Sequence, residues 1–310
     1  MKILVTGATG LIGRSLCASL AAEGHSVTGL SRSPERAAGV AARMLEWNPM
    51  VGPPPEESLS NLDAIVHLAG EPIAARRWTA EQKKRIRDSR ILSTKNLVDG
   101  LRAAQSKPEV LVGGSAVGFY GERGDEELDE SSAQGSGFMS ELCAEWEQEA
   151  ARARSLGIRV VHLRTGVVLS RDGGALKKML TPFKLGLGGK LASGRQWFPW
   201  IHIEDIIGII RFAIASAALS GPVNGAAPEP VTNAEFTREL ARALHRPAFF
   251  TVPEFALRLA LGEMADALLM SQRVLPKAAL AAGYQFRFPR LGAALDDLFA
   301  EKEATTRGAS

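Results

Sequence analysis

The sequence has little of several features that would otherwise define its class. Only two of its 310 residues are cysteines, Cys17 and Cys143, and they form no Cys-x-x-Cys pair or cysteine–histidine cluster. We therefore expect no disulfide framework and no metal site. No stretch of 18 apolar residues occurs, and the apolar run at residues 3–5 ends at Thr6, so neither a membrane span nor a signal peptide is predicted. These absences predict a reduced, cytoplasmic location and no membrane partner.

An excess of one charge is also missing. The 37 basic and 34 acidic residues leave a formal net charge of +3, and no run of five like charges occurs. A mixed, solvated surface explains this balance, and no basic stripe or aromatic platform indicates nucleic-acid binding. With 45% hydrophobic residues the chain can bury a large core, and its length suits about two domains.

The first thirty residues predict one β-α-β unit. Residues 2–5 (KILV) are a short apolar run typical of a strand buried on both faces of a parallel sheet. Apolar residues then recur at helical spacing from Leu11 to Ala21, and Gly24 closes this helix before extended character resumes at residues 27–30.

Three glycines spaced three residues apart, Gly7, Gly10 and Gly13, lie between this strand and this helix. Gly7 allows a tight turn, Gly10 lets a pyrophosphate approach the backbone, and Gly13 allows close packing of helix and strand. The helix that begins near Leu11 directs free amides and its positive dipole end at the anion. A glycine turn without a ligand is the alternative, but the placement favours a dinucleotide, and the absence of a following GK[ST] disfavours a P-loop hydrolase.

The end of the second strand distinguishes between the two nicotinamide dinucleotides. An NAD site commonly has Asp or Glu about 20 residues after the glycines, whereas this chain has Ser31 and Arg32. A guanidinium and hydroxyls suit a 2′-phosphate, which a carboxylate would repel. We therefore predict NADP(H) in preference to NAD(H); the alternative is that Arg32 is an ordinary solvated side chain.

Residues 61–70 predict another buried strand that ends at small residues. Leu68, Ala69 and Gly70 would let the adenosine ribose and the pyrophosphate lie across its carboxyl end. His67 lies inside the apolar run, and we interpret it as a packed core histidine.

Several longer strings resemble the extended short-chain dehydrogenase/reductases, which include nucleotide-sugar epimerases and dehydratases. TGATGLIG resembles their cofactor loop, and HLAG, SAVGFYG and FPWIHIEDI resemble later segments. AGEPIAARRW, RTGVVLSRDGGAL and GYQFRFPRLGAAL are similar to an atypical epimerase-like subgroup that has its own small C-terminal domain. The resemblance implies cofactor contacts at Gly7, Thr9, Gly10, Leu11, Ile12, Arg32, Leu68, Ala69, Arg90 and Val167.

The predicted fold is α/β, with a Rossmann-type doubly wound parallel sheet and a smaller mixed α/β substrate domain. We place the dinucleotide-binding domain at residues 1–168 plus 201–226 and the substrate-side domain at 169–200 plus 227–300, with a loose tail at 301–310. His202 and Asp205 resemble a stretch that caps and positions a helix, so we predict structural roles for both. Related folds often pair through long helices, and the helices expected over 79–104 and 137–155 could form a homodimer interface.

The wider family needs a Tyr that exchanges a proton and a Lys four residues later that lowers the pKa of this Tyr. Residues 137–147 contain no such pair: Phe138 or Met139 occupies the Tyr position, and Leu142 or Cys143 the Lys position. The chain has only two tyrosines in total, so the missing acid is not hidden under another alignment.

Ser115 and Tyr120 are the polar groups left near the expected active site. The family hydroxyl generally lies where this chain has Ala116, one position after Ser115. Both residues are candidate catalytic groups; the alternative is that they only form the wall of the cleft. A hydride could still pass between nicotinamide and a carbonyl if another acid or water supplies the proton.

Residues 194–200 (GRQWFPW) combine an arginine with three aromatic residues. Such groups bind flat or anionic ligands, so Arg195, Trp197 and Trp200 are candidate substrate contacts for an anionic or nucleotide-linked small molecule. Core packing between domains is the alternative for the tryptophans. Two functions follow from the sequence: an NADP(H)-binding oxidoreductase or epimerase-like enzyme, or a catalytically weak NADP(H)-binding protein that senses redox state.

Overall fold

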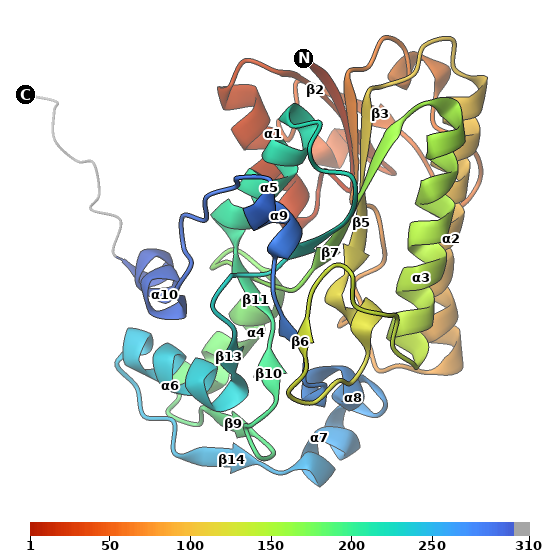
Figure 1. Ribbon diagram of the computed structural model, residues 1–310. Coiled ribbons are helices and arrows are strands. Elements are labelled where there is room, and N and C mark those ends of the chain that lie inside the picture. The colour runs from red at the N-terminus through yellow and green to blue at the C-terminus, as the bar shows by residue number, and fades with distance from the viewer. Residues whose placement is uncertain (301–310) are drawn as a thin grey trace, which may run out of the picture.

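The computed structural model describes residues 1–300, and its centre is one parallel β-sheet (Figure 1). Seven strands form the sheet in the order β12-β7-β5-β4-β1-β2-β3. They are β1 (Lys2–Thr6), β2 (Ser26–Ser31), β3 (Arg43–Glu46), β4 (Ala64–His67), β5 (Val110–Ala116), β7 (Arg159–Thr165) and β12 (Gly221–Gly225). The order reverses between β1 and β4, which confirms the doubly wound sheet that the sequence predicts.

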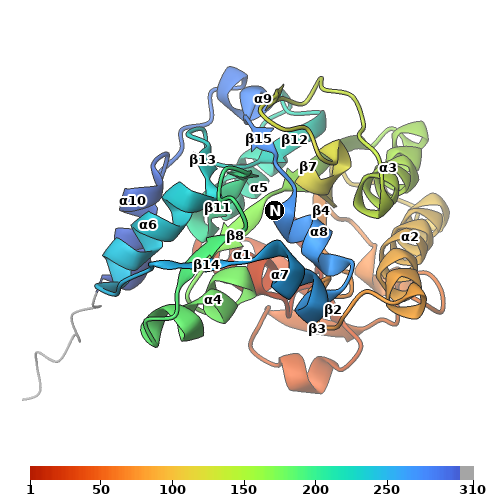
Figure 2. The ribbon, with the colours of Figure 1, turned by 90° about the horizontal axis from the view of Figure 1, so that it is seen from below.

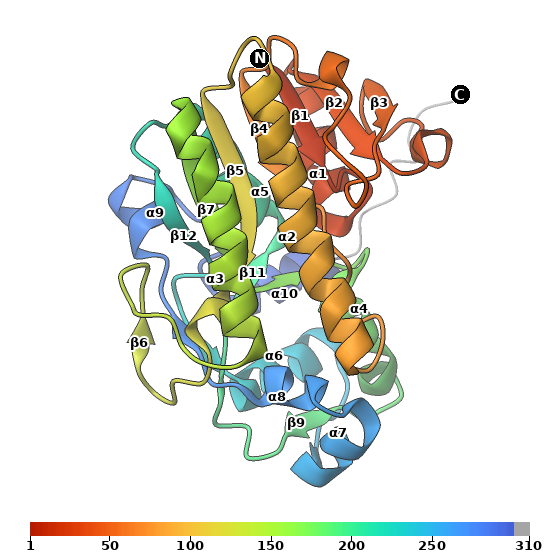
Figure 3. The same cartoon turned by 90° about the vertical axis from the view of Figure 1, so that its right-hand side faces the viewer.

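Helices cover both faces of the sheet. The helices α2 (Ala80–Ala103) and α3 (Phe138–Ala151) lie side by side on one face, and α1 (Leu11–Ala22) and α5 (Ile203–Ala215) lie on the other (Figures 1 and 3). The two long predicted helices are confirmed with shifted ends. Thr79 is the N-cap of α2, and α3 continues into the 3₁₀ helix η4 (Arg152–Leu156). The homodimer stays a prediction.

The central strands are apolar throughout because both faces of the sheet are covered. Ile3 and Val5 face one hydrophobic cluster together with Leu16 of α1. Leu4, between them, faces a second cluster on the α2 side together with Leu97. Alternate residues of one strand are therefore buried against different helices, which explains the unbroken apolar run at residues 2–5.

The remaining elements lie mostly beyond the carboxyl ends of the strands (Figures 1 and 2). Four two-stranded pairs occur there: β8 (Val167–Leu169) with β11 (Trp200–His202), β10 (Trp197–Phe198) with β13 (Val231–Thr232), β9 (Gly189–Leu191) with β14 (Phe250–Val252), and β6 (Glu127–Leu128) with β15 (Arg273–Val274). The helices are α4 (Gly174–Lys184), α6 (Asn233–Leu244), α7 (Glu254–Leu261), α8 (Met264–Leu269), α9 (Lys277–Ala281) and α10 (Leu291–Phe299). Short 3₁₀ helices are η1 (Pro34–Ala37), η2 (Glu56–Ser58) and η3 (Val117–Tyr120). The domain boundaries stay predictions, and the predicted tail at 301–310 lies outside the described residues.

The start of α5 is fixed by the two residues for which we predict structural roles. Nδ1 of His202 accepts a hydrogen bond from the backbone N–H of Glu204 at 3.1 Å, which caps the helix. The buried carboxylate of Asp205 accepts the backbone N–H groups of Arg287 at 2.7 Å and Phe288 at 2.9 Å. Both structural roles are confirmed, and Asp205 joins the C-terminal segment to the start of α5.

Within residues 1–300, none of the helices combines the length and the apolar character needed to cross a membrane.

Candidate functional site

The glycine turn after β1 fits only glycine at two of its three positions. Gly7 has a φ of +67°, and a Cβ added there would lie 2.6 Å from the carbonyl carbon of Leu68. A Cβ on Gly13 would lie 2.2 Å from the carbonyl oxygen of Gly7. Both contacts are with backbone, which cannot rotate away. The turn therefore holds the start of α1 directly against the ends of β1 and β4.

The third glycine leaves the start of α1 open. Gly10 is the N-cap residue in an extended conformation, and among residues 1–300 no side chain caps this helix. A Cβ on Gly10 would approach within 4 Å only the carbonyl oxygen of Gly7, at 3.2 Å. The first amides of the helix, from Leu11 onward, are therefore available to an anion at an N-terminus whose dipole favours negative charge.

The end of β4 lies beside this turn. The backbone N–H of Leu68 donates to the carbonyl of Thr6 at 3.2 Å, and that of Ala69 donates to Thr6 Oγ1 at 3.3 Å. Gly70 lies against Arg90, since an added Cβ would be 3.1 Å from the guanidinium carbon. The residues predicted around β4 and the glycines are therefore brought together, with Arg90 of α2 beside them.

Arg90 is held in place by backbone oxygens. Its Nη1 donates to the carbonyl of Glu71 at 3.0 Å and to that of Ile86 at 3.1 Å. The guanidinium also lies over the ring of Trp146 at 5.2 Å from the ring centroid. Burial lowers the pKa of Arg90 from its usual value. The side chain is thus a pre-positioned cation at the carboxyl end of β4.

Ser31 and Arg32 follow the neighbouring strand β2. Ser31 Oγ accepts a hydrogen bond from the backbone N–H of Ser33 at 3.1 Å. Arg32 is exposed, and its guanidinium forms no ion pair with any other residue in the described part of the chain. The predicted cation is thus available to a ligand beyond the end of β2.

The helix α4 reaches across from the C-terminal elements to the glycine turn. Added Cβ atoms on Gly173 and Gly174 would lie 3.3 Å and 3.1 Å from the side chain of Leu11. Further along α4, Lys178 Nζ donates to the carbonyl of Ala74 at 2.7 Å. Val167, which precedes this segment, is partly buried, and its N–H donates to the carbonyl of Pro199 at 2.7 Å.

His67 is buried beneath this site, as predicted, and its tautomer can be deduced. Thr94 Oγ1 donates to the carbonyl of Arg90 at 2.7 Å, so it can only accept from Nε2 of His67, 3.0 Å away. Nε2 therefore carries a proton, and because burial lowers the pKa of the ring to about 4 the ring is neutral at pH 7, so Nδ1 accepts from Thr6 Oγ1 at 2.7 Å. His67 thus joins the strand before the glycine turn to the helix that carries Arg90.

The burial of two histidines, His67 and His162, predicts that the fold loses stability in acid. Burial lowers the pKa of His67 to about 4, and that of His162 also to about 4. A histidine whose folded-state pKa lies below its unfolded value stabilises the fold fully above about pH 6.5, and this contribution is lost as the pH falls toward 4. For His67 alone we expect a loss of about 3 kcal/mol of unfolding free energy across this window.

Denaturant unfolding measured between pH 7 and pH 4 checks this expectation. His67→Gln keeps a neutral donor and acceptor, so its stability should fall less steeply than that of the unmodified protein. An equally steep fall in both proteins would show that His67 does not titrate as proposed.

The positions of the missing proton relay are filled by packed apolar side chains. Met139 and Leu142 are buried in a cluster with Trp78, and Phe138 packs against this cluster. The rings of Phe138 and Trp78 meet edge to face with centroids 5.4 Å apart. Cys143 is buried, and burial raises the pKa of its thiol to about 12. No proton exchange is available from these positions at neutral pH.

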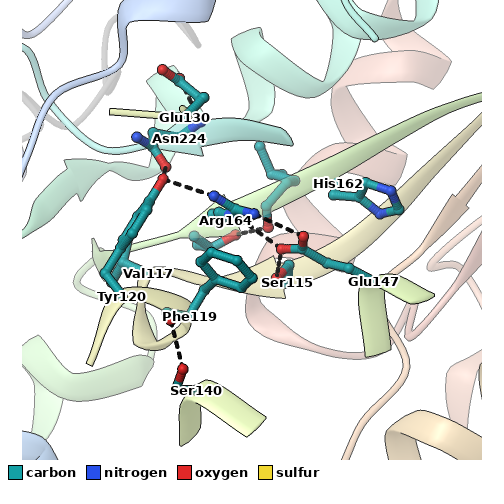
Figure 4. Close-up of polar contacts among 12 residues, drawn as sticks. Ser115, Val117, Phe119, Tyr120, Glu130, Ser140, Glu147, His162, Arg164 and Asn224 are labelled. Carbon is teal, nitrogen blue, oxygen red and sulfur yellow. Dashed lines mark hydrogen bonds and ion pairs between the residues drawn. The ribbon is translucent and has the colours of Figure 1, made fainter. Parts of the chain in front are cut away.

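Ser115 and Tyr120 belong instead to a buried polar network (Figure 4). Ser115 Oγ donates to Glu147 Oε1 at 2.7 Å. Arg164 donates to both Glu147 oxygens, from Nε at 2.8 Å and from Nη2 at 2.9 Å. Nη1 of Arg164 donates to the Tyr120 hydroxyl at 3.0 Å, which in turn donates to Asn224 Oδ1 at 2.7 Å.

The network leaves no hydroxyl directed at a substrate. Tyr120 is 0% exposed, and its single proton is already donated to Asn224. Burial raises the pKa of Tyr120 to about 12, although Arg164 acts in the opposite direction. Ser115 donates its proton to Glu147. The geometry therefore argues against our expectation that these two residues are catalytic, and favours the alternative that they brace the wall of the site.

Glu147 and Arg164 were not among the candidates from sequence. Glu147 lies within the segment that lacks the relay, four residues after Cys143 and so on the same side of α3. Arg164 is 4% exposed on β7, and its guanidinium lies 3.5 Å from the ring centroid of Phe119. The available signal for this pair was a second arginine near the end of β7, a strand whose residues 160–164 are all buried.

The network continues toward the C-terminal elements through Glu130. Its two carboxylate oxygens accept the backbone N–H groups of Asn224 at 2.9 Å and Ala278 at 3.1 Å. Burial raises the pKa of Glu130. One carboxylate therefore links β12 to the start of α9.

The three candidate substrate contacts lie in different environments. Arg195 is exposed on the loop before β10. Trp197 Nε1 donates to Asp125 Oδ1 at 2.9 Å, and the guanidinium of Arg273 lies 4.8 Å from its ring centroid. Trp200 is 1% exposed and packs within the main hydrophobic cluster. Its burial favours the alternative that Trp200 packs in the core rather than contacting a substrate.

In residues 1–300, no group of three or more His, Cys, Asp and Glu side chains is arranged to hold a metal ion.

The chain is similar to known proteins over nearly its whole length. A family model described as the NAD dependent epimerase/dehydratase family matches residues 3–224, and a domain of unknown function, DUF1731, matches residues 252–298. Epimerase family protein Mb2239 of Mycobacterium bovis is 44% identical over 294 residues, covering 94% of this chain and 96% of its own.

Two solved structures are similar at different levels. Human epimerase family protein SDR39U1 (isoform 2), crystallised with NADPH, superimposes with a TM-score of 0.87 at 39% identity, covering 97% of this chain and 100% of its own. UDP-glucuronic acid 4-epimerase of Bacillus cereus, in complex with NAD, gives a TM-score of 0.75 at 18% identity over 96% of each chain, which shows a shared fold alone.

Proposed function

Because the chain belongs to the NAD-dependent epimerase/dehydratase family, we propose that the carboxyl edge of its sheet binds NADP(H). We further propose that the protein is an oxidoreductase or epimerase-like enzyme for a small molecule. The glycine turn carries this proposal: a helix begins there without a side-chain cap in the described residues, at a glycine whose missing Cβ leaves the amides open. A diphosphate is the anion that such a helix start commonly binds.

The residues around the turn supply the other contacts that the dinucleotide needs. The backbone of Thr9 and the amides from Leu11 to Gly13 would hold the diphosphate, since the Gly10 amide already donates to the carbonyl of Gly7. Leu68, Ala69, Gly70 and Arg90 would border the adenosine ribose. Val167 would contact the cofactor from β8. Ser31 and Arg32 would bind the 2′-phosphate, and the human relative crystallised with NADPH supports the phosphorylated cofactor. Bound NADP(H) would exchange a hydride with a carbon of the substrate.

The preference for NADP(H) is tested at Arg32. A guanidinium–phosphate contact contributes about 1.5–3 kcal/mol, so Arg32→Ala should weaken NADPH binding about 10- to 150-fold. NADH, which has no 2′-phosphate, should bind with nearly unchanged affinity. Fluorescence titration with both reduced nucleotides measures the two effects.

Arg102→Ala is the matched control, because Arg102 is also exposed but lies in the last turn of α2, away from the carboxyl edge of the sheet. This variant should bind both nucleotides normally. If the unmodified protein binds NADH as tightly as NADPH, the proposed preference is wrong.

The substrate we propose is an anionic or nucleotide-linked small molecule. Arg195 is exposed, and its guanidinium has no ion-pair partner in the part of the chain that the structure describes, so it remains available to an anion. Trp197, held by Asp125 and Arg273, supplies a fixed aromatic surface beside the same loop. The relay positions are apolar, so the proton that accompanies the hydride would come from another acid or from water.

A second function is favoured by one observation. The apolar packing of Phe138, Met139 and Leu142 replaces the proton relay while the glycine turn is kept. This combination suits an NADP(H)-binding protein that senses redox state and turns over slowly or not at all. Screening carbonyl compounds and nucleotide sugars for NADPH oxidation distinguishes the two functions: turnover supports the enzyme, and tight NADPH binding without turnover supports the sensor.

A further inference from the structure

A groove lies on α6, away from the glycine turn. It has a volume of about 640 Å³ and lies between α6, the segment 246–250 and Lys190 of β9. None of its lining residues belongs to the set that we assign to the dinucleotide. The groove is thus a separate cavity in the C-terminal part of the chain, of a size typical of small-molecule sites.

The groove is lined by basic side chains. Five of its lining residues are Lys190, Arg238, Arg242, His245 and Arg246, and no Asp or Glu is among those that line it in the described chain. Arg238 and Arg242 lie four residues apart on one face of α6, His245 is the C-cap residue of this helix, Arg246 follows it, and Lys190 comes from β9.

Acidic neighbours neutralise this charge only in part. Arg242 pairs with Glu239 and with Asp296, each at 2.9 Å. Arg238 is 4.0 Å from Glu239, which therefore serves two cations. Lys190 and Arg246 form no ion pair within residues 1–300. The four permanent cations thus exceed the two carboxylates, and an anion would meet a net positive surface.

The groove is also lined by exposed apolar side chains. Phe249 is 89% exposed and Phe250 is 52% exposed, at the start of the edge strand β14. Ala234, Ala241, Pro247 and Ala248 are further apolar residues that line the groove. Leaving two large apolar side chains in water is unfavourable, so their place in the lining of a basic cavity points to an apolar group that covers them.

The charges disfavour a second copy of this chain as the occupant. Across a two-fold axis the cations of one groove would face those of the other, and such contact between like charges is unfavourable. A small anionic ligand matches both the positive charge and the volume of the groove.

We infer that this groove binds a small organic anion whose phosphate or carboxylate contacts Lys190, Arg238 and Arg246 while its apolar body lies on Phe249 and Phe250. Arginine binds such oxyanions through paired N–H donors, and an aromatic ring stacks on phenylalanine. This second site is independent of the proposed dinucleotide site, and its ligand differs from inorganic phosphate in requiring the apolar body.

Calorimetric titration with three probes tests the inference: 2-naphthyl phosphate, octyl phosphate and inorganic phosphate. We expect saturable binding of at least one of the two organic phosphates, at least tenfold tighter than that of inorganic phosphate; the stronger of the two shows whether the body is aromatic or aliphatic. The double variant Arg238→Glu with Arg246→Glu should weaken the organic phosphate at least tenfold, and Phe249→Ser at least threefold. All three positions are exposed, so these changes should not disturb folding.

NADPH affinity measured on the same variants separates this site from the dinucleotide site and should remain within twofold of that of the unmodified protein. Arg102→Glu is the control for a simple change in net charge and should leave binding of the organic phosphate unchanged. Three results would overturn the inference: no saturable binding below 1 mM, equal binding of inorganic and organic phosphate, or equal weakening by Arg102→Glu.

Discussion

Glu147→Leu is expected to lower the free energy of unfolding by about 3–5 kcal/mol. The side chains of Glu147 and Arg164 are 11% and 5% exposed, and the carboxylate accepts two hydrogen bonds from the guanidinium and one from Ser115. Removing the carboxylate leaves a buried cation without a counter-charge. The hydroxyl of Ser115 loses its acceptor as well. Chemical denaturation at pH 7 measures the change.

Two further variants show whether the unpaired charge is the cause. Combining Glu147→Leu with Arg164→Met removes both charges, so the double variant should recover part of the lost stability. The matched control is Glu149→Leu on the same helix, whose carboxylate is 26% exposed and pairs with Arg152. An exposed pair contributes at most about 1 kcal/mol. A loss for Glu147→Leu no larger than that of the control would contradict the prediction.

The fold around the glycine turn was predictable because the local sequence pattern and the packing of the whole sheet specify the same structure there. The apolar run at residues 2–5, the glycines and the helical spacing from Leu11 each specify the same strand–turn–helix unit, and a strand covered on both faces is apolar throughout. His67 was also predictable, since one polar residue inside an apolar run must be buried with its hydrogen bonds satisfied.

The wall of the site was not predictable for a physical reason. Ser115, Glu147 and Arg164 come from β5, α3 and β7, and their partners are fixed only when these elements pack. The sequence shows Tyr120 as one of two tyrosines, but not that its hydroxyl is buried against Asn224. Similarly, Trp197 and Trp200 belong to different short strands that pair with β13 and β8, and these long-range pairings leave Trp197 partly exposed while Trp200 enters the core.

Gly10→Val is expected to weaken NADPH binding more than about 100-fold, which corresponds to about 2.7 kcal/mol. Gly10 has φ −75° and ψ 175°, a conformation that valine adopts readily. Apart from the Gly7 carbonyl oxygen at 3.2 Å, no heavy atom outside the neighbouring residues and the helix backbone lies within 4 Å of an added Cβ, so the substitution meets little steric opposition at this atom. The valine side chain would, however, occupy the place where a diphosphate must approach the helix amides.

Denaturant unfolding shows whether weaker binding results from a loss of the fold. Replacing an N-cap glycine should lower the free energy of unfolding by only about 1 kcal/mol. Gly52→Val is the matched control: no heavy atom lies within 4 Å of its added Cβ, its φ is not positive, and it lies in the loop between β3 and β4 rather than at the turn. This control should bind NADPH normally. If Gly10→Val binds NADPH as tightly as the control, the diphosphate does not lie on the start of α1, and the cofactor site must be placed elsewhere on the sheet edge.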